Sequence, residues 1–331
     1  DANTTGSYNT GVGRQALSAN TTGNTNDAFG YYALATNTTG DYNTALGARA
    51  LQTNNGDANV AIGRDSLRLN STGQYNVAVG PYTLDANTTT SNNTACGYAA
   101  LGANTSNSNT AVGYAALLVN TTGNSNVALG VRALAANLDT NNSTAVGFDA
   151  LRYNTAADNT AVGSVALDAN TTGSHNTACG KGALSASTTA DYNTAVGKNA
   201  LVANTTGTQN TAVGALSLDA NTTTSYNTAC GYGALGANAA GENLTAVGRS
   251  ALAANTTANW CTAVGERSLV SNTTGNYNVA VGHRALEDNT TGADNAAFGT
   301  YALKDSNGSY NTAIGNYTLD ANTTGGSNTA V

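Results

Sequence analysis

The sequence predicts an all-β fold, a parallel β-solenoid (β-roll) of about twenty coils, each sixteen or seventeen amino acids long. Three observations lead to this prediction. One unit of sequence recurs along the whole chain, apolar residues keep fixed positions inside that unit, and helical periodicity is absent. We therefore interpret residues 1–331 as a single continuous repeat domain in which each coil packs on its two neighbours.

The repeat is clearest in residues 193–207, Asn-Thr-Ala-Val-Gly-Lys-Asn-Ala-Leu-Val-Ala-Asn-Thr-Thr-Gly. The glycine at Gly197 recurs at nineteen places from Gly13 to Gly315, in steps of seventeen positions that shorten to sixteen four times. The lost residue falls in or near Asn-Thr-Thr-Gly, which indicates a turn. Below, a row is the set of equivalent residues in all coils, and it is named by its member in this reference coil.

Two rows predict the core. The Leu201 row is leucine in all nineteen complete coils, and the Val196 row is always Val, Leu, Ile, Phe or Cys. None of the 12 basic and 19 acidic residues falls in either row or in the Gly197 row. Because charged side chains are almost never buried without a partner, we assign Val196 and Leu201 to the interior. The two apolar runs of each coil predict two short strands of four or five residues.

The Ala195 row is alanine in nineteen of twenty coils, with Gly11 as the exception. Side chains of a strand alternate between its faces, so this row is expected to point away from Val196. An unbroken row of alanine on an outer face suggests that another surface packs there, and we predict self-association, most simply as a homotrimer. The alternative is that alanine is merely a compact outward residue.

Asparagine predicts two ladders. It holds the Asn193 row in seventeen of twenty coils and the Asn204 row in eighteen. Asparagine suits turns, and stacked amides bond along a fibre axis. Fourteen residues of the Asn204 row, among them Asn20, Asn204 and Asn272, also fit the Asn-x-Ser/Thr acceptor of N-glycosylation. Possible glycosylation therefore stands beside the structural interpretation.

Other chemistry is sparse. Cys96, Cys179 and Cys230 replace the Val196 row and are expected to be core thiols, too far apart for disulfides. His175 and His283 lie in different coils, so we predict no metal site, no cofactor and no catalytic triad. The net charge of −7 and the lack of a basic patch argue against a nucleic-acid partner, and no apolar run could insert in a membrane.

Charged and aromatic residues recur on rows that we expect to face solvent. The basic residues lie one, two or five places after the repeat glycine, as in Arg14, Arg49 and Arg68. Tyrosine recurs just before the Asn193 row and just after the repeat glycine. Stacked aromatic rings could bind sugars, or they could cover the backbone and pack along the axis.

The unit Asn-Thr-Ala-Val-Gly followed by Ala-Leu resembles the head repeats of trimeric autotransporter adhesins. It is more similar to the tandem Asn-Thr-Ala-Val-Gly arrays of bacteriophage tail-fibre and bacterial surface fibre proteins, and the resemblance covers the whole chain. The adhesin relatives imply a left-handed parallel β-roll, three chains around an axis, and adhesion. The coil of this chain departs from that pattern because it is longer than theirs.

These observations lead to a functional hypothesis. We predict a non-enzymatic structural rod, the shaft of an extracellular, cell-surface or virion fibre, with itself as partner in a homotrimer or an end-to-end filament. The alternative is an adhesin-type module that recognises glycans or a cell surface. Ice binding is more remote, because Val60, Val77 and other residues interrupt the threonine row. The chain starts without methionine and stops in mid-repeat, so we expect a segment of a longer protein.

Overall fold

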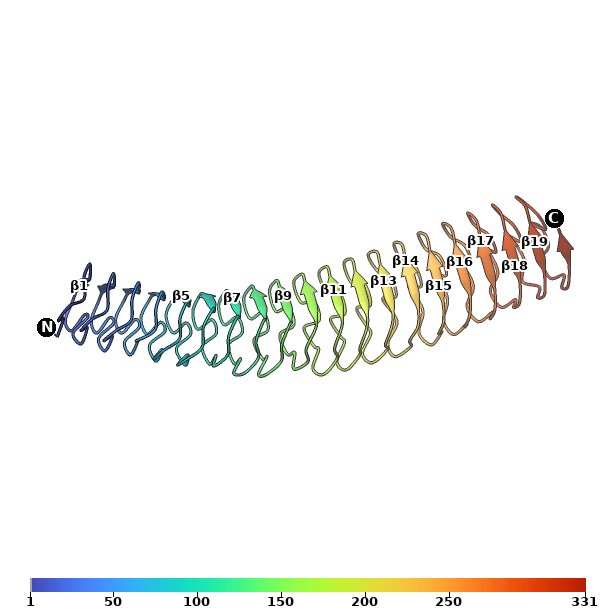
Figure 1. The fold of residues 1–331 in the computed structure, drawn as a ribbon. Helices are drawn as coiled ribbons and strands as arrows, with labels where there is room; N and C mark the ends of the chain where they lie inside the picture. Colours follow the sequence, from blue (N-terminus) through green and yellow to red (C-terminus); the bar gives the residue numbers. More distant parts are fainter. Residues whose placement is uncertain (1) are drawn as a thin grey trace. The chain divides into compact units, whose positions relative to one another are not determined.

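The computed structural model describes residues 2–331, and the chain forms two units, Asp1–Asn159 and Thr160–Val331. Each unit is a stack of coils, most of them seventeen amino acids long, with one short strand per coil in a parallel sheet (Figure 1). No helix occurs in residues 2–331. The predicted fold class, an all-β parallel solenoid, is therefore confirmed.

The described part of the first unit contains nine strands, all of three residues. They are β1 (Thr10–Val12), β2 (Asp27–Phe29), β3 (Thr44–Leu46), β4 (Val60–Ile62), β5 (Val77–Val79), β6 (Thr94–Cys96), β7 (Thr110–Val112), β8 (Val127–Leu129) and β9 (Thr144–Val146).

The second unit contains eleven strands within residues 160–331. They are β10 (Thr160–Val162), β11 (Thr177–Cys179), β12 (Thr194–Val196), β13 (Thr211–Val213), β14 (Thr228–Cys230), β15 (Thr245–Val247), β16 (Thr262–Val264), β17 (Val279–Val281), β18 (Ala296–Phe298), β19 (Thr312–Ile314) and β20 (Thr329–Ala330).

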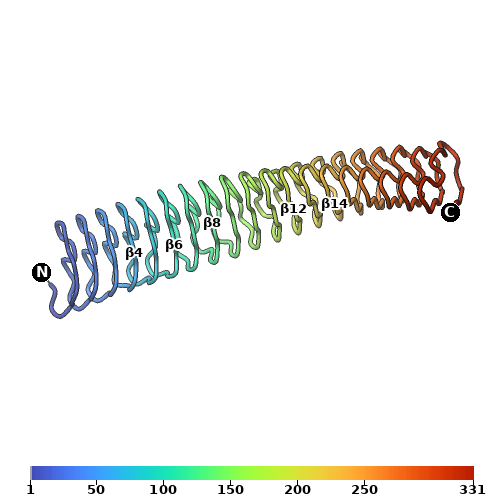
Figure 2. The backbone as a smooth tube through the Cα atoms, turned by 90° about the horizontal axis from the view of Figure 1, so that it is seen from above, coloured from blue at the N-terminus to red at the C-terminus, as the bar shows by residue number. Residues whose placement is uncertain are grey.

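Neighbouring strands pair in register. Ala195 lies beside Ala212, and Val196 lies beside Val213. Within each unit, every coil lies next to the coil that follows it in the sequence (Figure 2). Each row of the repeat therefore becomes a column of like side chains, with successive members about 4.8 Å apart, the usual distance between paired strands.

The prediction of two strands per coil is wrong, because the second apolar run is not extended. Asn199 and Leu201 have φ angles of +56° and +51°, in the left-handed region. Backbone hydrogen bonds close this side of the coil. The backbone N–H of Asn204 donates to the Leu201 carbonyl at 3.1 Å, and the backbone N–H of Leu201 donates to the Ser217 carbonyl of the next coil at 3.0 Å. A segment with left-handed residues at Asn199 and Leu201 is not an extended strand and does not place side chains on alternate faces, so Ala200 and Leu201 are both buried.

The interior is lined by Ala195, Ala200 and Leu201, each with no exposed surface. A β-carbon built on Gly11, the one glycine of the Ala195 row, would lie 3.7 Å from Cβ and Cδ1 of Leu17. The Ala195 row therefore points inward, against the Leu201 row, and the space between them accommodates a methyl group. Because Val196 follows Ala195 in the strand, it must point outward.

The assignment of Val196 to the core is therefore wrong, and so is the outward direction of Ala195. Leu201 lies in the interior as predicted. The inward direction of Ala195 removes the basis on which that row predicted a homotrimer. The apolar surface that does face outward is the Val196 row.

The two asparagine rows form buried hydrogen-bonded columns. The Asn193 Oδ1 accepts the backbone N–H of Asn210 at 2.9 Å, and the Asn193 Nδ2 donates to the Gly207 carbonyl at 2.9 Å. The Asn204 Nδ2 donates to the same carbonyl at 2.9 Å, and its Oδ1 accepts Nδ2 of Asn221 at 3.0 Å. The side chains thus satisfy backbone groups that the turn leaves unpaired.

Candidate functional site on the outer face of the sheet

The outer face of each sheet presents two rows of side chains, the Thr194 row and the Val196 row. In β12 the burial pattern is half-buried, buried, exposed, and the other full-length strands of the second unit repeat it with small changes. Val196, Val213 and Val247 are each 37–38 % exposed. The face therefore carries Thr-x-Val in eight of the twenty described strands, and other combinations of Thr or a small or apolar residue with Val, Leu, Ile, Phe or Cys in nearly all the rest.

This outer face is almost uncharged, and its Val196 row is apolar throughout. The exposed members of the Val196 row include Phe29, Leu46 and Ile62 in the first unit and Phe298 and Ile314 in the second. Asp27 is the one charged residue that the twenty described strands contain. Exposed apolar surface that extends over several hundred Å² marks an interaction site more often than a free surface.

The cysteines of the Val196 row share this exposure. Cys96, Cys179 and Cys230 are exposed free thiols, so their prediction as core thiols is wrong for the same reason as that of Val196. Cys261 is different, since it replaces an asparagine of the Asn193 row and is buried. Burial raises the pKa of the Cys261 thiol to about 11, and its Sγ donates to the Gly275 carbonyl at 3.2 Å.

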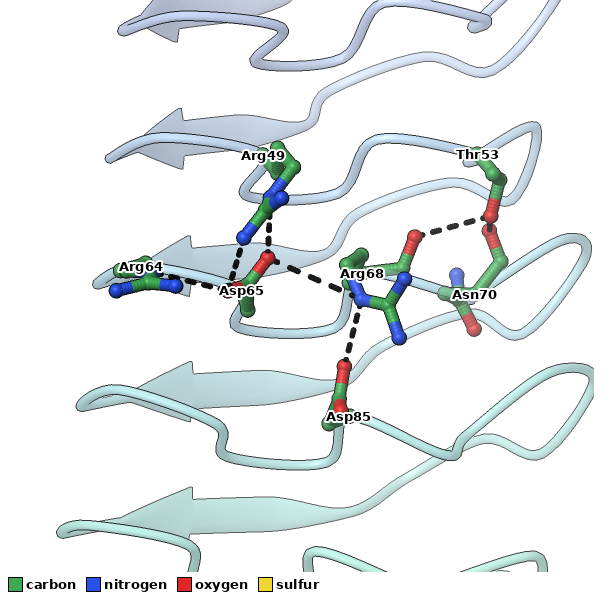
Figure 3. A network of polar contacts seen from close by, with 7 residues as sticks. All are labelled: Arg49, Thr53, Arg64, Asp65, Arg68, Asn70 and Asp85. Atoms are coloured by element: carbon green, nitrogen blue, oxygen red, sulfur yellow. Dashed lines mark hydrogen bonds and ion pairs between the residues drawn. The ribbon is translucent and has the colours of Figure 1, made fainter.

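Some charged residues of the predicted solvent rows are buried instead. Asp65, Asp149 and Glu287 expose only 2–6 % of their surface. Figure 3 shows Asp65 held by Arg49 through two hydrogen bonds of 2.6 and 2.7 Å, with Arg64 at 3.2 Å from the same carboxylate. Asp149 is held in the same way by Arg132. These ion pairs join successive coils, which a row-by-row interpretation of the sequence does not reveal.

The pKa of Asp65 is lowered from its ordinary value of 3.8. Burial alone would raise this pKa, but the hydrogen bonds and positive charges of Arg49 and Arg64 together outweigh it. A lowered pKa in the folded state stabilises the protein above the ordinary value, and this contribution is lost as the pH falls through the folded value.

We expect Asp65→Asn to lower the local stability of the coils around β4 by about 1–2 kcal/mol at neutral pH, because Arg49 loses its charged partner. The loss should shrink as the pH falls below the ordinary value of 3.8 and should disappear as the pH falls through the lowered pKa that Asp65 has in the folded chain. Native-state hydrogen exchange at several pH values measures both effects. The matched control is Asp139→Asn, since Asp139 is exposed. An equal effect of the two variants would contradict this role of Asp65.

Aromatic rings of neighbouring coils stack along the sheet. Trp260 and Tyr277 are parallel within 2°, with ring centroids 5.1 Å apart, and His175 lies 4.8 Å from Tyr192. In these pairs one face of each ring contacts its neighbour, and about half of the surface of Trp260 and Tyr277 stays exposed. This arrangement agrees with packing along the axis, and it leaves about half of the surface of Trp260 and Tyr277 open to a ligand.

Ser174, His175 and Asp191 form a polar cluster that the sequence interpretation missed. The Ser174 Oγ lies 3.0 Å from the His175 Nδ1 and donates to the Asp191 Oδ1 at 3.0 Å. A hydrolytic triad needs the hydroxyl to give its proton to an imidazole that a carboxylate orients. Here the carboxylate accepts from the hydroxyl itself, so this contact does not have the triad order.

The asparagines predicted as possible glycosylation acceptors lie inside the coils. Asn20, Asn204 and Asn272 expose at most 1 % of their surface, and each Nδ2 donates to a turn carbonyl at 2.9–3.0 Å. The folded coil has no room for a glycan on these atoms. Exposed asparagines that begin an acceptor sequence include Asn92, Asn142 and Asn243, just before the Asn193 row, and also Asn3 and Asn307.

Comparison with known proteins identifies no relative. No family model matches the chain, and neither a curated protein nor a solved structure matches it. Within residues 2–331, no three acidic, histidine or cysteine side chains are grouped so as to hold a metal ion. The same residues contain no helix that is long and apolar enough to cross a membrane.

Proposed function

We propose that this chain is a structural rod, the shaft of an extracellular, cell-surface or virion fibre, and that it has no enzymatic role. The observation that carries the proposal is the unbroken pairing of coils within each unit. Each coil adds a strand in register and buried side chains that fill the interior, and most coils add one asparagine to each of the two buried columns. A stack in which each coil is bonded only to its neighbours gains length with each repeat and resists bending and proteolysis.

One route to a longer fibre follows from this proposal. Coils stacked end to end continue the same ladders, because a first or last coil leaves strand groups unpaired. Three chains around an axis remain the prediction drawn from the resemblance to trimeric adhesins.

Electron microscopy of the purified chain, together with limited proteolysis, tests the rod. We expect thin unbranched rods, and a chain that a broad-specificity protease cuts slowly when folded and quickly after heat denaturation. Rods that lengthen with protein concentration would support end-to-end stacking. Compact round particles, or rapid internal cleavage of the folded chain, would contradict the proposal.

An adhesin is the second candidate, and the observation that favours it is the pair Trp260 and Tyr277. Both rings are half exposed and lie parallel to each other, so together they offer an aromatic surface that could bind a sugar ring. A glycan array tests this function, with Trp260→Ala and Tyr277→Ala as the variants. Binding that both substitutions abolish would support an adhesin, whereas binding that neither changes would exclude this pair as its site.

A further inference from the structure

We propose that the outer sheet face of the unit Thr160–Val331 is covered by the same face of a second copy of this chain. The two sheets pack face to face, with the Thr194 and Val196 rows of each copy between them. This inference deepens the structural-rod function, and it rests on that function only in requiring that the coils stack into a sheet. The contact between chains is therefore assigned to the Val196 row, and not to the Ala195 row from which the sequence predicted self-association.

The first argument is the area of the face. The strands β10 to β19 each present two outward side chains. If an outward side chain at this exposure offers roughly 40 Å², ten coils offer about 800 Å² in total. A stable interface buries about 800 Å² on each partner, so this face alone is large enough.

The second argument is the absence of charge. No strand of the second unit contains a charged residue, although Lys181, Lys198 and Arg249 lie exposed just beyond the ends of their strands. The charged side chains lie on the turns, where a partner sheet would leave them in water. A face that excludes charge while its borders carry it has the composition of an interface core surrounded by a polar rim.

The third argument is the spacing, which identifies the partner. The outward side chains recur at the rise of one coil, about 4.8 Å, over all strands of the unit. Only a surface with the same rise can fit its side chains between those of this face over many coils, as paired sheets do in dry zipper interfaces. A second copy has the same rise because it consists of the same coils, whereas the side chains of a globular partner would fit between those of only a few coils.

The shape of the face favours two copies over three. Two sheet faces that pack on each other lie about 10 Å apart, so both outward rows of each copy reach the other face. Around a three-fold axis only the side chains nearest the axis would meet, and part of the Thr194 or Val196 row would stay exposed. The paired arrangement covers both rows.

Sedimentation of the full chain over a range of concentrations measures the association. We expect a species of twice the chain mass of 32.9 kDa that dissociates on dilution. The double variant Val196→Lys with Val213→Lys should raise the dissociation constant by at least about tenfold, because it places like charges in a dry contact. The matched control is Thr206→Lys with Thr223→Lys, which adds the same charge on exposed turn residues away from the sheet.

Thiol labelling gives an independent measurement on the same protein. Cys179 and Cys230 lie in the proposed contact, and Cys261 is buried inside its coil. We expect a maleimide reagent to modify Cys179 and Cys230 of the native chain more slowly at a concentration where the chains are paired than at one where sedimentation finds a single chain. Cys261 should stay unmodified at both concentrations, because it is buried inside its coil whether or not the chains pair.

Several results would overturn the pairing. They are a folded monomer at all concentrations, a species of three chains, dissociation by the turn variant, or equal labelling rates of Cys179 and Cys230 in the native chain at the two concentrations. Electron microscopy separates this failure from failure of the proposed function. Rods of single-chain width with a monomeric mass would contradict the pairing alone, whereas the absence of rods would contradict both.

Discussion

Replacing Gly197 with alanine is expected to disrupt the stack at that coil. Gly197 has a φ of +136°, and a β-carbon there would lie 2.6 Å from the carbonyl carbon and oxygen of Gly214 in the next coil. Both atoms belong to the backbone, so relief requires the coils to separate. We expect a loss of at least about 3 kcal/mol in the local free energy of opening, from backbone strain and steric overlap together.

Native-state hydrogen exchange measures this loss at amides that join the two coils, such as Gly214, whose N–H donates to the Val196 carbonyl at 2.7 Å. The matched control is Gly233→Ala. Gly233 has a φ of +60° with no atom within 4 Å of an added β-carbon, and Asn199 holds the equivalent position at +56°. That variant should cost at most about 1 kcal/mol. Equal costs would show that the corner does not need glycine.

Replacing Leu201 with alanine is expected to cost about 2–5 kcal/mol, because Leu201 is fully buried against the Ala195 row and its removal leaves a cavity in a narrow interior. Replacing Val196 with alanine should cost less than about 1 kcal/mol in the single chain, since that side chain is 37 % exposed. Hydrogen exchange at low protein concentration measures both variants under the same conditions.

The comparison of these two variants tests the direction of the strand. If Val196 were in the core, as the sequence predicts, both variants would be costly. A third variant, Ala195→Val, separates the two cases further. An outward alanine would accept the larger side chain, whereas the inward alanine has room only for a methyl group, so we expect overpacking to cost about 1–3 kcal/mol. A neutral Ala195→Val would contradict the structure.

The period and the rows could be predicted because they are properties of the sequence alone. Nineteen leucines in the Leu201 row and seventeen asparagines in the Asn193 row leave little choice about which residues stack on which. The repeat also predicts the all-β parallel class, since a short unit without helical periodicity can pair only with its neighbours. The asparagine turns followed from the same count.

The row that forms the outer face could not be predicted from the sequence, because Ala195 and Val196 are adjacent and both apolar. Alternation requires them to point in opposite directions, but it does not say which one points inward. Burial of Asp65 was equally invisible in the rows, because it depends on Arg49 lying one coil away in space and 16 residues away in sequence. The direction of Ala195 and the burial of Asp65 both depend on which side chains lie nearby in space, and the position of a residue in the repeat does not specify them.

The sequence by itself determined a stack of coils, the members of each row, and the leucine and asparagine columns that hold the coils together. Only the tertiary structure decided which apolar row faces water. The reason is the left-handed backbone at Asn199 and Leu201, which turns the chain back so tightly that Leu201 lies against the strand. The space that remains accepts the methyl group of Ala195 and leaves the larger Val196 outside.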